Sequence, residues 1–271
     1  MQKTFRVQKK SGDYEEFSYA KLKLSLENSG ATKTQVEEVL QDIKPYLKEG
    51  LKTSDIYAHA YTLLRRDRSA ASYRYKIKKA IMELGPTGFA FEKFISRILT
   101  HLGYTTEVGQ IKQGLCVQHE VDVIAKKENY TLFAECKYKN NAGTKTDIKT
   151  ALYVQARSLD LNKNHKFDEY WLITNAKFSE DAIKYAECSG LRLMGWSYPP
   201  EHNLMKRLES LSLIPITCLN SLHRDHKNFL ISKEILFCQD LKNHPEIFQD
   251  LRLPSKLEKM VRDELKIINC G

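Results

Sequence analysis

The sequence of 271 residues predicts an α/β protein built from three successive parts. In the middle of the chain, short β-branched and aromatic runs alternate with segments of helical spacing, as in a mixed sheet layered between helices. A strand-like hairpin followed by amphipathic segments comes before this part and predicts an α+β bundle. After Pro199 and Pro200, which neither a helix nor a central strand continues through, leucine-patterned runs predict a small all-α module. We therefore expect domains at 1–85, 86–198 and 199–271.

The composition fits a globular protein with a polyanionic partner. Hydrophobic residues make up 42% of the chain and aromatic residues 10%, which is enough to build cores in several domains. The formal net charge is +9, and most of the excess lies in residues 1–85. A basic balance favours nucleic acid as a partner, although basic proteins of other classes are common.

The chain also lacks the features of exported and membrane-bound proteins. No apolar run approaches the roughly 20 residues of a membrane helix, and the first ten residues contain no apolar signal core. The six cysteines include no Cys-x-x-Cys pair, which argues against a zinc ribbon and gives no reason for a disulfide framework. We expect a cytoplasmic protein with reduced thiols and no membrane partner.

The N-terminal part begins with the strand-like segments FRVQK and YEEF, which are joined by a turn at Gly12. Four helices follow, and Thr53 is expected to cap the third, which begins at TSDI. Lysines on a glycine-punctuated hairpin, together with a helix N-terminus, offer point charges and amide donors to a triphosphate. The alternative is a solvated basic hairpin.

This part resembles the ATP-cone, a small nucleotide-binding effector domain with a β-hairpin and a helix bundle. The resemblance rests on VQKKSG, Glu16-Phe17, AKLKLSL, the TSDI helix start and Tyr73-Arg74-Tyr75. It implies ATP or dATP as an effector, bound by Val7, Lys9, Lys10, Gly12, Lys21 and Thr53. The same segment has no P-loop pattern, so a bound nucleotide would act as a signal rather than a fuel.

The central part contains the residues that indicate chemistry. VDVIA and YTLFAEC predict two strands joined by a polar turn, and strand alternation turns Glu135 and Lys137 to one side. Asp122 lies between two valines and is expected to face Glu135. Two carboxylates suit Mg²⁺, a hard cation that keeps several waters and shares its shell with a phosphate. The lysine can then orient the attacking water and offset charge in the transition state.

A solvated hairpin with the same residues by chance is the alternative, and the flanking segments bear on it. Upstream, Phe91, Ile95, Ile98 and Leu102 form a helical stripe, with Glu92 at its edge and Gly103 at its end. Downstream, Ile148, Leu152, Gln155 and Leu159 are expected on one buried face, which places a glutamine at a core position.

With EYWLITN and LRLMGW as further strands, residues 86–198 resemble the Mrr-like branch of the PD-(D/E)xK nucleases. The resemblance implies a restriction-endonuclease-like α/β/α fold with Asp122 and Glu135 as ligands of Mg²⁺, or of Mn²⁺ in its place. It also implies Lys137 as the catalytic lysine, Glu92 as an accessory acid and Gln155 as the helix glutamine. The proline that usually precedes the aspartate is replaced by Glu120-Val121.

Together these patterns predict a Mg²⁺-dependent DNA endonuclease of restriction or defence, regulated by a nucleotide and assembled as a homo-oligomer. Two alternatives remain open from the sequence. The same fold serves Holliday-junction and repair nucleases, and a nucleotide-responsive DNA-binding regulator would have no need of the catalytic residues. The corner from Asn175 to Lys177 is either a phosphate contact or a plain surface turn.

Overall fold

The computed structural model describes residues 4–67, 69–85, 87–141 and 143–269. The chain divides into two compact units, of which one combines the residues up to Ala80 with those from Ile214 onward. The other unit is continuous, Ile81–Leu213. The segment after the two prolines is therefore divided: helix α8 (Leu204–Ser210) lies in the central unit, and the rest groups with the N-terminal part.

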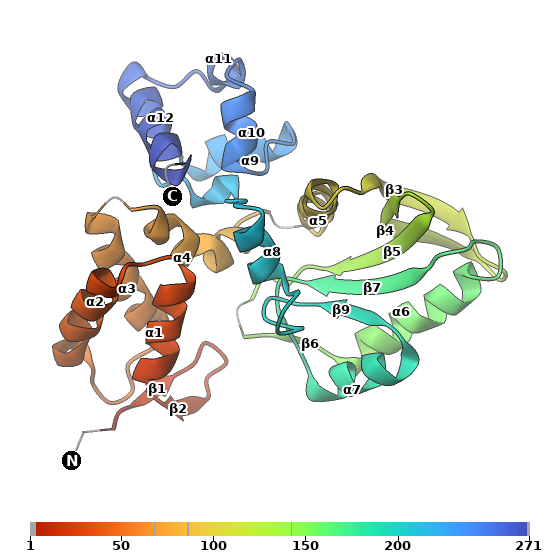
Figure 1. Ribbon diagram of the computed structural model, residues 1–271, viewed down its shortest axis with the longest axis horizontal. Coiled ribbons are helices and arrows are strands. Elements are labelled where there is room, and N and C mark those ends of the chain that lie inside the picture. Colours follow the sequence, from red (N-terminus) through yellow and green to blue (C-terminus); the bar gives the residue numbers. More distant parts are fainter. Residues whose placement is uncertain (1–3, 68, 86, 142, 270–271) are drawn as a thin grey trace. The chain divides into compact units, whose positions relative to one another are not determined.

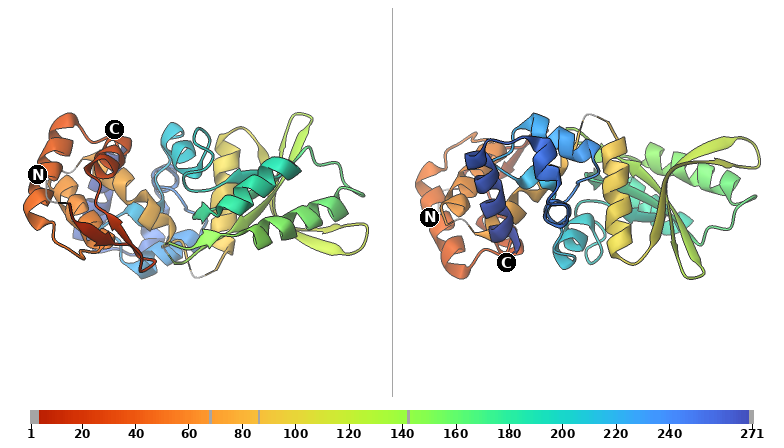
Figure 2. Two further views of the ribbon diagram at one scale, coloured as in Figure 1. Left: turned by 90° about the horizontal axis from the view of Figure 1, so that it is seen from below. Right: turned by 90° about the horizontal axis from the view of Figure 1, so that it is seen from above.

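A five-stranded mixed sheet forms the middle layer of the central unit, in the order β3-β4-β5-β7-β9. Neighbours from β3 to β5 are antiparallel, whereas β7 and β9 run parallel to β5. Helix α5 covers one face, and helices α6 and α7 lie together on the other (Figure 1, Figure 2). The bounds are α5 (Phe89–His101), β3 (Thr105–Gln113), β4 (Gln118–Lys127), β5 (Tyr130–Lys137), α6 (Ile148–Leu161), β7 (Glu169–Thr174), α7 (Glu180–Ser189) and β9 (Arg192–Met194).

The sequence patterns described above explain several of these helices and strands. Phe91, Ile95 and Ile98 are fully buried on the inner face of α5, and Gly103 follows the helix with a φ of 90°, a left-handed angle that favours glycine. Strands β4 and β5 pair as an antiparallel hairpin, as predicted. The Ser179 hydroxyl accepts a hydrogen bond from the amide of Ala182 and caps α7.

A second, two-stranded sheet is formed by the segments that precede α6 and follow β7. Strands β6 (Lys145–Thr146) and β8 (Lys177–Phe178) pair in parallel, with Lys145 opposite Lys177. Thr146 and Thr174 are both fully buried beside this pair, and their hydroxyls lie 3.2 Å apart.

The first part of the other unit contains the expected hairpin and helices: β1 (Arg6–Gln8), β2 (Tyr14–Glu16), α1 (Tyr19–Asn28), α2 (Lys33–Tyr46), α3 (Thr53–Arg66) and α4 (Ala70–Ile81). A core that includes Leu26, Ile43 and Leu64 holds them together. The expected cap at Thr53 is wrong. Lys52 is the N-cap of α3 without a side-chain hydrogen bond, and Thr53 is the first helical residue.

The last part of the chain packs on this bundle and is helical: η1 (Ile216–Cys218), α9 (Arg224–Ser232), α10 (Cys238–Asn243), α11 (Ile247–Leu251) and α12 (Ser255–Asn269). The Thr217 hydroxyl donates to the carbonyl of Ala80 at 2.7 Å, and the Tyr61 hydroxyl donates to the Asn220 side chain at 2.6 Å. The five described cysteines are free thiols, and Cys270 lies outside the described residues. Within the described ranges, no helix combines the length and the apolar character that crossing a bilayer requires.

Candidate active site

The candidate site forms where β4 and β5 stop pairing. Their register ends at Val123 opposite Ala134, one pair before Asp122 and Glu135. The Cys136 amide is released from that ladder and donates to Asp122 Oδ2 at 2.7 Å. Strand β5 continues alongside β7 as far as Lys137. The predicted strand placement therefore brings Asp122 to the end of β5, beside Glu135 and Lys137.

Glu135 is held by two cations. Its side chain is almost fully buried, and Oε1 lies 2.6 Å from Lys137 Nζ. Its other oxygen, Oε2, accepts a hydrogen bond from the Arg157 guanidinium of α6. Because a buried carboxylate without a partner is strongly disfavoured, these two contacts compensate for the burial of Glu135.

Arg157 is the functional residue that the sequence reasoning missed. It is 8% exposed, and a second guanidinium nitrogen donates to the carbonyl of Glu120 on β4. Its guanidinium carbon lies 5.9 Å from the Phe133 ring centroid, so the group is packed against β5 as well. An arginine inside a helix does not stand out in a chain rich in lysine and arginine. Only its place among apolar residues of α6 could have indicated a buried ion pair.

The expected buried face of α6 is wrong. Leu152 is 46% exposed and Leu159 60%, whereas Ala151, Val154 and Leu161 are fully buried. The inward polar position is therefore held by Arg157 rather than by Gln155, which is half-buried and does not line the cavity. A helix face shifted by about one residue in register explains the error, because alanine is too small to mark a face by pattern.

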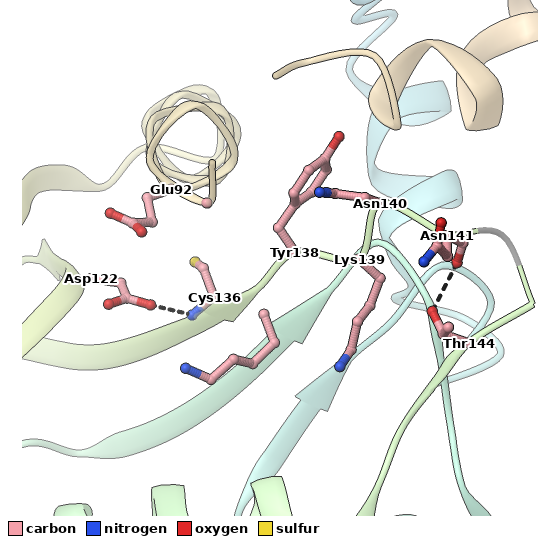
Figure 3. Close-up of a pocket in the computed structure, with 10 residues that line it drawn as sticks. Glu92, Asp122, Cys136, Tyr138, Lys139, Asn140, Asn141 and Thr144 are labelled. Carbon is pink, nitrogen blue, oxygen red and sulfur yellow. Dashed lines mark hydrogen bonds between the residues drawn. The ribbon is translucent and has the colours of Figure 1, made fainter. Parts of the chain in front are cut away.

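A cavity of about 500 Å³ opens in front of the carboxylates. Glu92 extends into it from α5 toward Asp122, and Tyr138 and Lys139 point to opposite sides of the chain beyond β5 (Figure 3). Three of the predicted site residues line the cavity: Glu92, Asp122 and Lys137. Glu135 lies behind them, in the sheet.

The crowding of carboxylates changes the ionisation of the site. Burial, followed by the charge of Glu135, raises the pKa of Asp122 to about 7. Burial and the charges of Glu120 and Glu135 raise the pKa of Glu92. Burial alone would lower the pKa of Lys137, but its ion pair with Glu135 and the charge of Asp122 outweigh this, so the pKa is raised. Lys137 is therefore an ammonium at neutral pH.

The donor atoms fit a hard divalent cation with few protein ligands. Among the described residues, no three side chains of His, Cys, Asp and Glu are grouped closely enough to form a complete metal cage. Mg²⁺ needs only one or two carboxylates, because it keeps water and phosphate oxygens in its shell. Asp122 lines the cavity, and a cation there would offset both causes of its raised pKa, the burial and the charge of Glu135. Glu135 can serve as the second ligand once the ion pair between Lys137 and its Oε1 opens.

The residues expected to bind a nucleotide lie around the β1–β2 hairpin. Lys9 and Lys21 approach the same carboxylate, that of Glu15, at 2.9 Å and 3.1 Å. The Gln8 amide donates to the carbonyl of Leu51, which brings the hairpin to the start of α3 and thus to Thr53. Gly12 has a φ of 95° in the turn, the Lys10 side chain is exposed, and the side chain of Val7 is buried in the core.

Comparison with known proteins adds two family matches. Residues 85–196 match the family model described as restriction endonuclease, and residues 214–268 match the one described as AF1548-like, C-terminal. An uncharacterized protein of Archaeoglobus fulgidus is 38% identical over 173 residues, which cover 64% of this chain and 98% of that protein.

The chain is also similar to solved structures. The crystal structure of AF1548, a protein of unknown function, has 34% sequence identity and a TM-score of 0.59, and the match covers 68% of this chain and all of that one. MspJI restriction endonuclease in complex with a 27-mer oligonucleotide has 13% identity and a TM-score of 0.33, covering 48% of this chain and 31% of that one. A score this low does not establish a common fold.

Proposed function

Because this chain belongs to the family of AF1548-like proteins and carries a restriction endonuclease domain over residues 85–196, we propose that it is a metal-dependent endonuclease. Its substrate is DNA, and the reaction is hydrolysis of a phosphodiester bond. The observation that carries the proposal is the meeting of Asp122 with Glu135 and Lys137 at the edge of a cavity, where β4 and β5 part. A role in restriction of foreign DNA accords with the family of this domain.

The residues divide the chemistry between them. Asp122 and Glu135 would hold Mg²⁺, or Mn²⁺ in its place, which supplies a Lewis acid for the charge that develops on the phosphate. Lys137 remains protonated and donates hydrogen bonds that orient the attacking water and stabilise the same charge. Glu92 faces the cavity with a raised pKa, which suits it to exchange a proton with a water or with the leaving oxygen.

The test compares carboxylates of the β4–β5 hairpin. Asp122→Asn keeps the acceptor for the Cys136 amide but removes the charge, and should abolish Mg²⁺-dependent plasmid cleavage while DNA binding survives. Glu135→Gln should do the same. Glu128→Gln removes an equal charge from an exposed side chain in the turn between β4 and β5 and should retain cleavage. Cleavage by Asp122→Asn at the wild-type rate would refute the assignment.

We further propose that ATP or dATP binds at the β1–β2 hairpin and regulates the nuclease. Lys9 and Lys21 converge on Glu15, so their ammonium groups are near enough to share one triphosphate, with Gly12 and Lys10 in the adjoining turn. Regulation requires that the nucleotide bind two states of the protein with different affinity, whether these differ in assembly as a homo-oligomer or in conformation. A coupling of typical size would change DNA affinity about 5- to 150-fold.

The variant Lys9→Ala/Lys21→Ala should lose nucleotide binding and the nucleotide dependence of cleavage, whereas Lys23→Ala/Lys33→Ala, which removes two exposed lysines from α1 and α2, should lose neither. Equilibrium dialysis and sedimentation with and without nucleotide measure this. Identical cleavage, affinity and sedimentation of the wild type in ATP, dATP and buffer would end the regulatory proposal.

A further inference from the structure

We propose that the β6–β8 strand pair is a docking site for the phosphodiester backbone of nucleic acid, next to the cavity of the candidate active site. The proposed contacts are Lys145 and Lys177, together with Lys139 in the cavity wall. The inference rests on the proposed nuclease function and names the surface that holds the substrate beyond the scissile phosphate.

The first observation is an unfavourable pairing of charge. Lys145 and Lys177 are register partners in neighbouring strands, and both are exposed. Like charges directly opposite each other destabilise a strand pair. Within the part of the chain that the structure describes, neither ammonium has an ion-pair partner. An anionic ligand across both strands would remove this repulsion.

The second observation is that buried hydroxyls fix this pair to the catalytic strand. The Thr146 hydroxyl of β6 donates to the Thr174 hydroxyl, which in turn donates to the carbonyl of Lys137 at 2.6 Å. Both threonines are fully buried. The backbone that carries Lys145 is therefore held at a set position relative to Lys137, as a substrate-positioning surface requires.

The third observation concerns the segment between β5 and β6. Asn175 is 5% exposed, and its side chain accepts from the Lys139 amide at 2.8 Å and donates to the Lys139 carbonyl at 2.9 Å. This double contact fixes the main chain of a lysine that lines the cavity (Figure 3). Thr144, which also lines the cavity, directly precedes Lys145. The lysines thus continue outward from the cavity wall.

The ligand chemistry follows from the residue types. Three lysines supply point charges without the planar, bidentate geometry that arginine offers to base edges. They suit phosphate groups, whose contacts position a duplex without specifying sequence. The docking site is therefore expected to bind all duplexes equally and to lose affinity as salt rises.

The experiment measures binding of a fluorescent DNA duplex to the full chain by anisotropy, in EDTA, over a salt series. Lys145→Gln/Lys177→Gln should weaken binding and flatten the slope of log K against log salt by about 0.9 for each lost contact, hence about 2 in total. The matched control is Lys163→Gln/Lys166→Gln. These two exposed lysines precede β7, whereas Lys177 follows it, so they lie toward the opposite end of the strand. The control should leave the slope unchanged.

Two further readouts separate docking from a structural role. The double variant should be at least as stable to heat as the wild type, because two like charges have been removed. Its cleavage rate at saturating DNA should stay near the wild-type rate, while its KM rises. If the wild type cleaves DNA and the double variant has the wild-type salt slope, the docking site is overturned and the proposed nuclease function is not. A wild type that neither binds nor cleaves DNA would overturn both.

Discussion

At the scale of a single residue, the protonation of Asp122 makes the stability of the protein depend on pH. In the metal-free protein its pKa rises to about 7 from the ordinary aspartate value, chiefly because the side chain is buried and Glu135 is close. The folded state therefore binds a proton more tightly than the unfolded state does. Stability should then fall as pH rises from about 4 to about 7, and remain level above that.

Asp122→Asn should abolish this fall. The variant has no charge to bury, so above pH 7 and in EDTA it should be more stable than the wild type, by an amount on the order of a few kcal/mol. Urea unfolding at a series of pH values measures the difference. If the wild type and the variant lose stability in parallel between pH 4 and pH 7, another group is responsible.

Mg²⁺ bound at Asp122 should raise the stability of the folded protein, whereas the unpaired charge of Asp122 lowers it. A cation that binds the folded state at 100 times its dissociation constant stabilises the wild type by about 2.7 kcal/mol, and its removal by EDTA reverses this. Asp122→Asn should show little of this stabilisation. Thermal unfolding at pH 8 with and without Mg²⁺ tests the ligand assignment without relying on cleavage.

At the scale of elements, Arg157 joins α6 to two strands of the sheet. Arg157→Met would leave Glu135 buried with Lys137 as its one cationic partner among the described residues, and should cost about 3–5 kcal/mol of stability. Arg192→Met is the control, since Arg192 is exposed and its pair with Glu169 should contribute about 1 kcal/mol or less. Adding Glu135→Gln to Arg157→Met should recover part of the loss. Equal effects of the two arginine substitutions in urea unfolding would contradict the buried role.

The elements also show what local pattern could and could not predict. Strands β4 and β5 and helix α5 were predictable because long β-branched or helical runs carry their own period. Strand β3 was missed, since Thr105–Gln113 contains Gly109, lacks regular alternation and pairs on one side only. The predicted convergence of Asp122 and Glu135 followed from strand parity. The contact of Arg157 with Glu135 joins residues 22 apart on different elements, which no local period can reveal.

At the scale of the whole molecule, the residues from Ile214 onward complete the bundle formed by the first 80. Asn220 accepts hydrogen bonds from Tyr61 and from the buried ammonium of Lys76. Asn220→Ala would remove the one side-chain oxygen that accepts both hydrogen bonds and should destabilise this unit by about 1–3 kcal/mol, because the half-buried Tyr61 hydroxyl would lose this partner. Asn243→Ala, at an exposed position, should have little effect.

Hydrogen exchange can show which helices and strands Asn220→Ala destabilises. Amides of α3 and α4 should lose protection, whereas those of β4 and β5 in the other unit should keep theirs, because the two units are separate compact bodies. Uniform loss of protection across both units, or none in α3 and α4, would contradict the division of the chain.

The grouping of the first and last segments also has a consequence during synthesis. Tyr61 and Lys76 leave the ribosome long before Asn220, which is more than 140 positions later. At 5–20 residues per second, the delay is roughly 7–30 s. The nuclease unit is continuous and can fold within that interval, while the first bundle waits for its partner helices. A released chain that ends at residue 213 should therefore be cut by protease within α3 and α4 but not within the completed sheet.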